Sequence, residues 1–80
     1  MKLFKISQDI NNDYDTFSDA IVCAENEEEA RKMHPKGFYN YKYDKDYGTW
    51  VKKEHVKVEY IGEAKKGMKR GVVCSSFNAG

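Results

Sequence analysis

The chain has 80 residues, of which 40% are hydrophobic and 34% are charged, with a formal net charge of +1. This size predicts one domain over residues 1–80, and the composition is typical of a globular fold rather than a disordered or fibrous chain. No apolar run approaches the roughly 20 residues that span a bilayer, and Lys5 and Asp9 interrupt the apolar core that a signal peptide needs. We therefore expect a cytoplasmic protein with no membrane partner.

Charge is distributed unevenly along the chain. Residues 1–30 hold two basic and eight acidic residues, a net charge of −6, whereas residues 31–80 hold twelve basic and five acidic residues, a net charge of +7. Such a division either steers a charged partner onto one face or holds two halves of a domain together. A chain this short buries only about 60% of its unfolded surface, so oligomerisation or docking on a partner would stabilise it.

The first elements in chain order are two strands that form a hairpin. Residues 3–7 alternate between apolar and polar side chains, which predicts a strand with one buried face. Residues 8–15 are dense in Asn and Asp, whose side chains favour turns. Residues 16–24 form the second strand, and its uninterrupted run of small and apolar residues predicts burial on both faces.

A short helix follows the hairpin. Asn26 is a good N-cap, and Glu29 lies where a capping box places its second residue. Three glutamates in the first turn complement the helix dipole, and basic residues as far as His34 do the same in the last turn. Pro35 and Gly37 are expected to end the helix.

Residues 38–50 hold six of the eleven aromatic residues, with lysine and aspartate interleaved. The rings have three interpretations: a small secondary core, the anchors of a protein interface, or platforms for stacked nucleic-acid bases. Tyr39, Tyr41 and Tyr43 alternate, so they would share one face of a strand. The aspartates among the rings and the low net charge make nucleic acid an unlikely partner.

Two further strands complete the predicted fold. Residues 56–61 alternate cleanly, and residues 71–77 form the last strand after a basic connection over residues 62–71. The order strand, strand, helix, strand, strand predicts an α+β fold, in which a four-stranded antiparallel sheet carries one short helix on one face. A right-handed crossover predicts that the second, first, third and fourth strands lie side by side in that spatial order.

No group of residues carries a catalytic or metal-binding signature. The acidic spacing that begins at Asp9 is reminiscent of a calcium loop, but Tyr14 and Ala20 stand where that loop needs glycine and glutamate. His34 and His55 each stand alone, without a neighbouring nucleophile or metal-ligand pattern. We therefore predict that the protein is not an enzyme and needs no metal or other cofactor.

The two cysteines, Cys23 and Cys74, each lie in an apolar, strand-like stretch. In a reducing cytosol such residues are usually free thiols rather than a disulfide. The sequence therefore predicts two buried, reduced cysteines.

Motifs spread over nearly the whole chain resemble a group of short phage and prophage proteins. They are KLFKISQ (2–8), NNDYDT (11–16), DAIVCA (19–24), EEEAR (27–31), His34-Pro35, Trp50, IGEA (61–64) and SFNAG (76–80). The resemblance implies a phage gene product that acts in the bacterial cytoplasm, and it brings no catalytic residues with it. Small non-enzymatic phage proteins of this size often inhibit host machinery, including CRISPR effectors and other defence systems.

We therefore expect a phage-type binding protein that inhibits a bacterial defence or host protein by occupying its surface. Acidic residues of the 8–15 loop and the helix start would form one negative surface that meets a basic cleft, and aromatic rings would anchor the contact. The expected partner-binding residues are Asp9, Asp13, Asp15, Glu27, Glu28, Tyr39, Tyr41, Tyr43 and Trp50.

The alternative function is a small-ligand binder that sequesters a nucleotide signal. Its base would stack on the aromatic rings, and basic side chains of the last connection would hold its phosphates. The expected phosphate-binding residues are Lys65, Lys66, Lys69 and Arg70.

Overall fold

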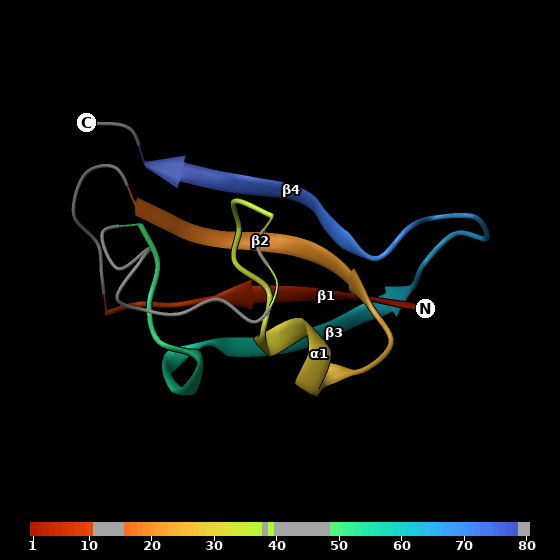
Figure 1. Ribbon diagram of the computed structural model, residues 1–80, viewed down its shortest axis with the longest axis horizontal. Coiled ribbons are helices and arrows are strands. Elements are labelled where there is room, and N and C mark those ends of the chain that lie inside the picture. The colour runs from red at the N-terminus through yellow and green to blue at the C-terminus, as the bar shows by residue number, and fades with distance from the viewer. Residues whose placement is uncertain (11–15, 38, 40–48, 79–80) are drawn as a thin grey trace.

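The computed structural model describes residues 1–10, 16–37, 39 and 49–78, and the other residues lie outside this description. The described residues form a four-stranded antiparallel sheet with a short α-helix on one face, which confirms the predicted α+β class (Figure 1). The elements are β1 (Lys2–Ser7), β2 (Thr16–Ala24), α1 (Glu27–Arg31), the 3-10 turn η1 (Lys53–His55), β3 (Lys57–Glu63) and β4 (Gly71–Asn78).

β1 lies inside the sheet, with β2 on one side and β3 on the other, as the sequence predicts. β1 and β2 form the expected hairpin, in which Lys2 lies opposite Ala24 and Ser7 lies opposite Asp19. β3 runs antiparallel to β1, and its register shifts at Ile61, the residue between two paired positions of β3. This shift is a β-bulge, which bends and twists the strand locally.

The position of β4 differs from the prediction. The sequence interpretation placed the last strand beside the third, but the order is β3-β1-β2-β4, so β4 pairs antiparallel with β2. Residues 64–70 cross one end of the sheet to reach it (Figure 1). This placement packs Phe77 against Phe17, with ring centroids 4.7 Å apart, and sets Val72 opposite Val22. If β4 had paired with β3 instead, Phe17 and Val22 of β2 would lack their contacts with Phe77 and Val72.

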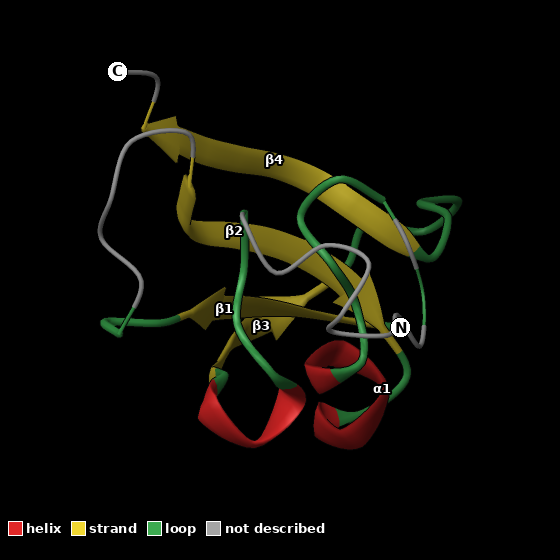
Figure 2. Ribbon diagram, turned by 60° about the vertical axis from the view of Figure 1, so that its left-hand side comes forward, coloured by secondary structure: helices red, strands yellow, loops and turns green. Residues whose placement is uncertain are grey.

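The core lies between one face of the sheet and the segments that follow β2. Figures 1 and 2 show α1 and the described parts of residues 32–56 on that face. Burial of such apolar side chains is the main stabilising contribution, at about 1.5–3 kcal/mol for each large one. The buried apolar side chains in contact there are Phe4, Ile6, Phe17, Ala20, Val22, Ala24, Ala30, Met33, Trp50, Val51 and Val56.

Helix α1 begins as predicted but is shorter than predicted, because it ends at Arg31. The Oδ1 atom of Asn26 accepts a hydrogen bond from the backbone N–H of Glu29 at 2.8 Å. The Glu29 carboxylate in turn accepts from the backbone N–H of Glu25 at 2.9 Å, one residue before the partner that a capping box uses. No described helix has the length and apolar character that would let it cross a bilayer.

His34 lies three residues beyond the end of α1 at Arg31, and it is fully buried. Its Nδ1 accepts the backbone N–H of Lys36 at 3.0 Å, and its Nε2 lies 3.2 Å from the Thr49 hydroxyl. An Nδ1 atom that accepts carries no proton, so the ring is neutral and Nε2 donates to Thr49. The turn ends at Gly37, whose φ of 102° suits glycine and whose N–H donates to the His34 carbonyl.

Candidate functional site

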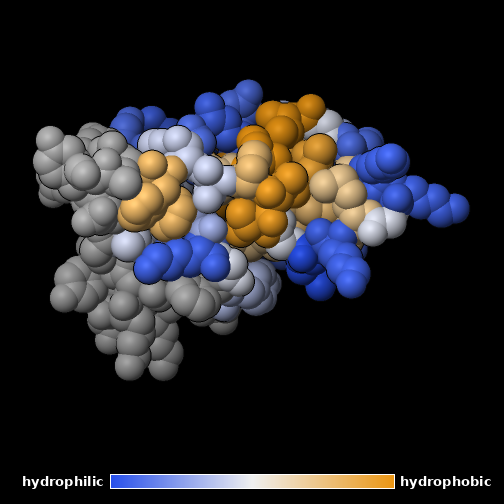
Figure 3. All heavy atoms as spheres, turned by 90° about the horizontal axis from the view of Figure 1, so that it is seen from above, coloured by the Kyte–Doolittle hydropathy of each residue, from blue (hydrophilic) through white to orange (hydrophobic). Residues whose placement is uncertain are grey.

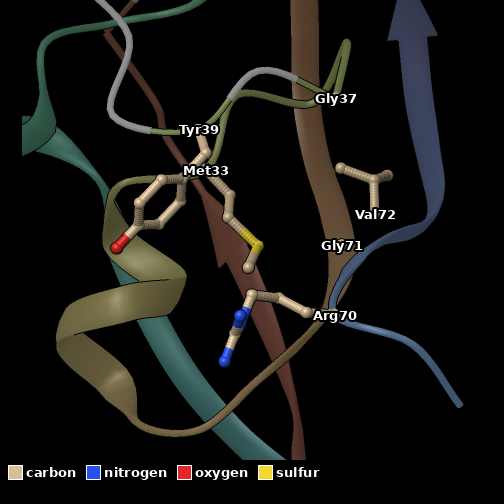
Figure 4. A pocket seen from close by; sticks show the side chains of 6 residues that line it. All are labelled: Met33, Gly37, Tyr39, Arg70, Gly71 and Val72. Atoms are coloured by element: carbon tan, nitrogen blue, oxygen red, sulfur yellow. The ribbon is translucent and has the colours of Figure 1, made fainter.

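A pocket of about 140 Å³ lies beside the start of β4 (Figure 4). Its walls come from two segments that are distant in sequence, the turn after α1 and the residues that lead into β4. The bridge between Met33 and Tyr39 joins the two sides of the turn. The lining residues are Met33, Gly37, Tyr39, Arg70, Gly71 and Val72. The pocket is therefore mainly apolar, with one guanidinium group among its lining.

The guanidinium group of Arg70 is tied to the start of α1. Its Nε donates to Glu29 Oε1 at 2.7 Å, and a second nitrogen lies 3.8 Å from Glu25. Burial raises the pKa of Glu29, but the backbone N–H of Glu25 and the Arg70 guanidinium outweigh burial, so its net pKa is lowered. The hydrogen bond to Glu29, and then the charges of Glu29, Glu25 and Tyr39, raise the pKa of Arg70. This ion pair links Arg70, the residue before β4, to Glu29 in the first turn of α1.

The described members of the predicted acidic surface come from two segments, the residues after β1 and the start of α1. Asp9 lies beyond the end of β1 that is distant from α1, and the six residues of β1 span roughly 20 Å. Its carboxylate pairs with the Lys57 ammonium at 2.6 Å, and this hydrogen bond lowers its pKa. Glu27 and Glu28 are exposed on α1, where Glu27 lies 3.6 Å from Arg31. Asp13 and Asp15, which would connect Asp9 to the helix start, lie outside the described residues, so one continuous acidic surface stays a prediction.

The predicted aromatic anchors have different positions. Tyr39 is 54% exposed at the pocket, where a partner could contact its ring. Trp50 is only 1% exposed and packs beside the His34 ring, with centroids 6.4 Å apart. Trp50 therefore belongs to the core and is not available as a surface anchor, which corrects the prediction. Tyr41 and Tyr43 lie outside the described residues.

Only one of the four predicted phosphate-binding residues lines the pocket. Arg70 lines it, whereas Lys65, Lys66 and Lys69 are exposed in the connection that precedes β4. Met68 N–H donates to the Lys65 carbonyl at 3.0 Å and closes a turn within this connection. Among residues 1–10, 16–37, 39 and 49–78, no cluster of three or more His, Cys, Asp or Glu side chains could hold a metal ion.

Sequence reasoning missed the character of β4. Cys74 is exposed on this strand, so the prediction that it is buried is wrong, although Cys23 is buried as predicted. Val73 and Phe77 are also exposed, at 48% and 45%. The signal was present in the sequence, because residues 71–78 contain no charged residue. The predicted strand order already placed this strand at an edge of the sheet, as the structure does, but with the third strand rather than β2 as its neighbour.

A buried glutamine was also missed. Gln8 follows β1, and its side-chain amide donates to the Phe17 carbonyl at 2.8 Å. Its side-chain carbonyl accepts the Ile10 N–H at 2.8 Å. Gln8 thus replaces strand hydrogen bonds at the point where the hairpin opens. The Asn and Asp content of residues 8–15 predicts a turn. Glutamine is not a typical turn residue, so that interpretation gives Gln8 no role of its own.

Comparisons with protein families, with curated proteins and with solved structures give no match to this chain.

Proposed function

We propose that this chain is a non-enzymatic phage-type protein that binds a bacterial host or defence protein and inhibits it by occupying its surface. The observation that carries the proposal is the exposed Tyr39 ring next to the acidic start of α1. Arg70 links the two, since it lines the pocket with Tyr39 and bonds Glu29 of the helix. An exposed aromatic ring beside exposed carboxylates fits a basic protein surface, because rings supply contact area and charges steer the encounter.

The carboxylates that remain most available are those of Glu27 and Glu28. Both are exposed, and Glu28 lies between Glu27, which pairs loosely with Arg31, and Glu29, which pairs with Arg70. The proposed contact surface therefore consists of Glu27, Glu28 and Tyr39. The resemblance to short phage proteins makes the cytoplasm of a bacterial host the proposed location.

The pocket dimensions favour a protein partner over a small ligand. Pockets that enclose small ligands usually measure about 300–1,000 Å³, whereas this one measures about 140 Å³. Arg70 also already holds two carboxylates, which compete with any phosphate. The nucleotide-binding alternative retains one favourable observation, because Tyr39 and Arg70 line the same pocket.

The test compares three variants of the full chain as bait in a lysate of a bacterial host, followed by kinetics on the captured, purified protein. Glu27→Lys/Glu28→Lys should slow association, and added salt should shrink the difference because screening acts over about 8 Å at physiological ionic strength. Tyr39→Ala should speed dissociation, because buried rings usually hold a complex together. Lys65→Glu/Lys66→Glu, which changes the charge by the same number of units with the opposite sign, is the matched control.

Two results would reject the proposed surface. One is unchanged association of the Glu27→Lys/Glu28→Lys variant at low salt together with loss of binding in the lysine variant. The other is a rise in melting temperature with a nucleotide that disappears in Tyr39→Ala and Lys65→Glu/Lys66→Glu, which would establish the small-ligand function instead.

A further inference from the structure

Strand β4 presents an open edge. It is the last strand of the order β3-β1-β2-β4, so one side pairs with β2 and no described strand covers the other. The outward N–H and C=O groups of such a strand are a template for another strand. β4 contains neither a charged residue nor a proline, which are two of the devices that protect an edge. Its register with β2 shifts by one residue at Val73, so a bulge is present on this edge as well as on β3.

The side chains of β4 are also unusually apolar for an exposed position. Val73 is 48% exposed, Phe77 is 45% exposed, and Cys74 is exposed as well. Figure 3, which looks onto the β4 side of the molecule, shows apolar side chains gathered there. Backbone groups that need a strand partner and side chains that gain from burial therefore coincide on the same edge.

We propose that β4 pairs with β4 of a second copy of this chain, so that two sheets join into one. A two-fold axis places β4 residues opposite β4 residues, and a strand without charges meets no like charge in that arrangement. The inference rests on the β4 edge and does not depend on the proposed function.

The charges around β4 select the antiparallel orientation. Lys65, Lys66 and Lys69 precede the strand, so a parallel pair would bring the two basic segments together. An antiparallel pair separates them by the length of the strand. Each basic segment then lies toward the other end of the partner strand, where Asp19 of β2 lies opposite Ser76. Opposite charges at both ends of a symmetric pair favour this association over the parallel one.

The other edge of the sheet stops the assembly at two copies. β3 carries Lys57, Glu59 and Glu63, and charged side chains on an edge strand oppose strand addition. An isologous contact between β4 edges uses the same surface on both copies and leaves nothing open for a third.

The experiment measures the mass of the full chain by sedimentation over a range of concentrations. The wild type should pass from monomer to dimer, and Val73→Lys should raise the dimer dissociation constant at least ten-fold, because it places a charge on each pairing edge. Ile61→Lys is the matched control, since Ile61 is 46% exposed on the β3 edge, and it should leave the dimer intact. An equimolar mixture of Val73→Lys and Val73→Glu should recover the dimer, which shows that both variants remain folded.

A bis-maleimide with a short spacer gives a second readout, because Cys74 is exposed and Cys23 is buried. It should link two wild-type copies, and it should fail to link Cys74→Ser. A wild type that stays monomeric at every concentration would overturn the proposal. So would a dimer that Ile61→Lys disrupts and Val73→Lys does not, or a monomer that loses a captured foreign protein on Val73→Lys, since β4 would then serve another protein's strand.

Discussion

The two edges of this sheet are protected to different degrees. On the β3 edge, charged residues alternate with apolar ones, whereas the β4 edge has no charge along its whole length. The hydrogen bonds that connect α1 to each edge strand differ as well. The Arg31 side chain of α1 donates to the Val56 carbonyl just before β3, while the described hydrogen bonds around β4 reach α1 only through Arg70. The difference teaches that a single small sheet can be closed to strand addition on one side and open on the other.

The aromatic rings at the edges repeat this contrast. Tyr60 of β3 packs edge-on against Phe4, with centroids 5.9 Å apart, and its hydroxyl donates to Glu63 at 2.6 Å. That hydrogen bond raises the pKa of Tyr60, with smaller contributions from burial and from the Glu63 charge. Phe77 of β4 packs against Phe17 at 4.7 Å and has no polar group to hydrate. The hydroxyl group makes Tyr60 compatible with an exposed position, whereas the wholly apolar Phe77 ring would gain from burial against another surface.

The largest effect should come from removing the protection of β3. A Lys57→Thr/Glu59→Thr/Glu63→Thr variant leaves both edges uncharged, so we expect open-ended assemblies that scatter light, because every copy would then offer two pairing edges. Adding Val73→Lys to this variant blocks β4 and should restore small species. A triple variant that keeps the mass of the wild type would show that charge is not what protects the β3 edge.

The next effect is on thiol reactivity. Cys74 should react with a disulfide reagent within the mixing time of an ordinary assay, because it is exposed. Cys23 should react slower by orders of magnitude, since it needs an opening whose free energy approaches a global stability of about 5–15 kcal/mol. The rate at Cys74 should fall as protein concentration rises, if β4 edges pair. In Cys74→Ser the fast phase should vanish, and a fast phase that survives would mean that Cys23 is accessible.

A smaller effect concerns the rings beneath the two edges. Phe17→Ala and Phe4→Ala should each lower the free energy of unfolding by about 3–5 kcal/mol, because each leaves a cavity in the core. Urea unfolding followed by the fluorescence of Trp50, the single tryptophan, measures both at equal protein concentration. Phe17→Ala should in addition weaken dimerisation through the loss of its contact with Phe77. A cost below about 1 kcal/mol for Phe17→Ala alone would show that the β4 side is loosely packed.

The smallest effect concerns the ion pairs near the edges. The pKa of Glu29 is lowered in the folded state, so its stabilising contribution is present above its unfolded pKa, about 4.3, and is lost as pH falls through the folded value. Glu29→Gln should therefore reduce stability at pH 7 by less than about 1 kcal/mol, and the difference from wild type should disappear once the pH falls below the folded pKa of Glu29. Asp9→Asn, in a more exposed pair, should change nothing measurable. A larger loss for Asp9→Asn than for Glu29→Gln would contradict this ranking.

The sequence by itself determined the elements that depend on local signals. The alternation in residues 3–7 and 56–61 and the Asn26 cap predict strands and a helix start at nearly the observed positions. These signals are local because a strand's two faces and a helix's first turn are defined by residues only two to four positions apart. The α+β class and the β1–β2 hairpin follow from the same information.

Only the tertiary structure decided where β4 lies and which side chains the core takes. Alternation shows which residues share a face of a strand, but it does not show which strand lies beside it, so the pairing of β4 with β2 and the exposure of Cys74 were not predicted. Trp50 and His34 are similar cases, since each has a polar atom that is equally compatible with a surface or with a buried partner such as Thr49. Burial is settled by contacts between segments distant in sequence, and those contacts also placed the charged strand β3 at one edge of the described sheet and the uncharged strand β4 at the other.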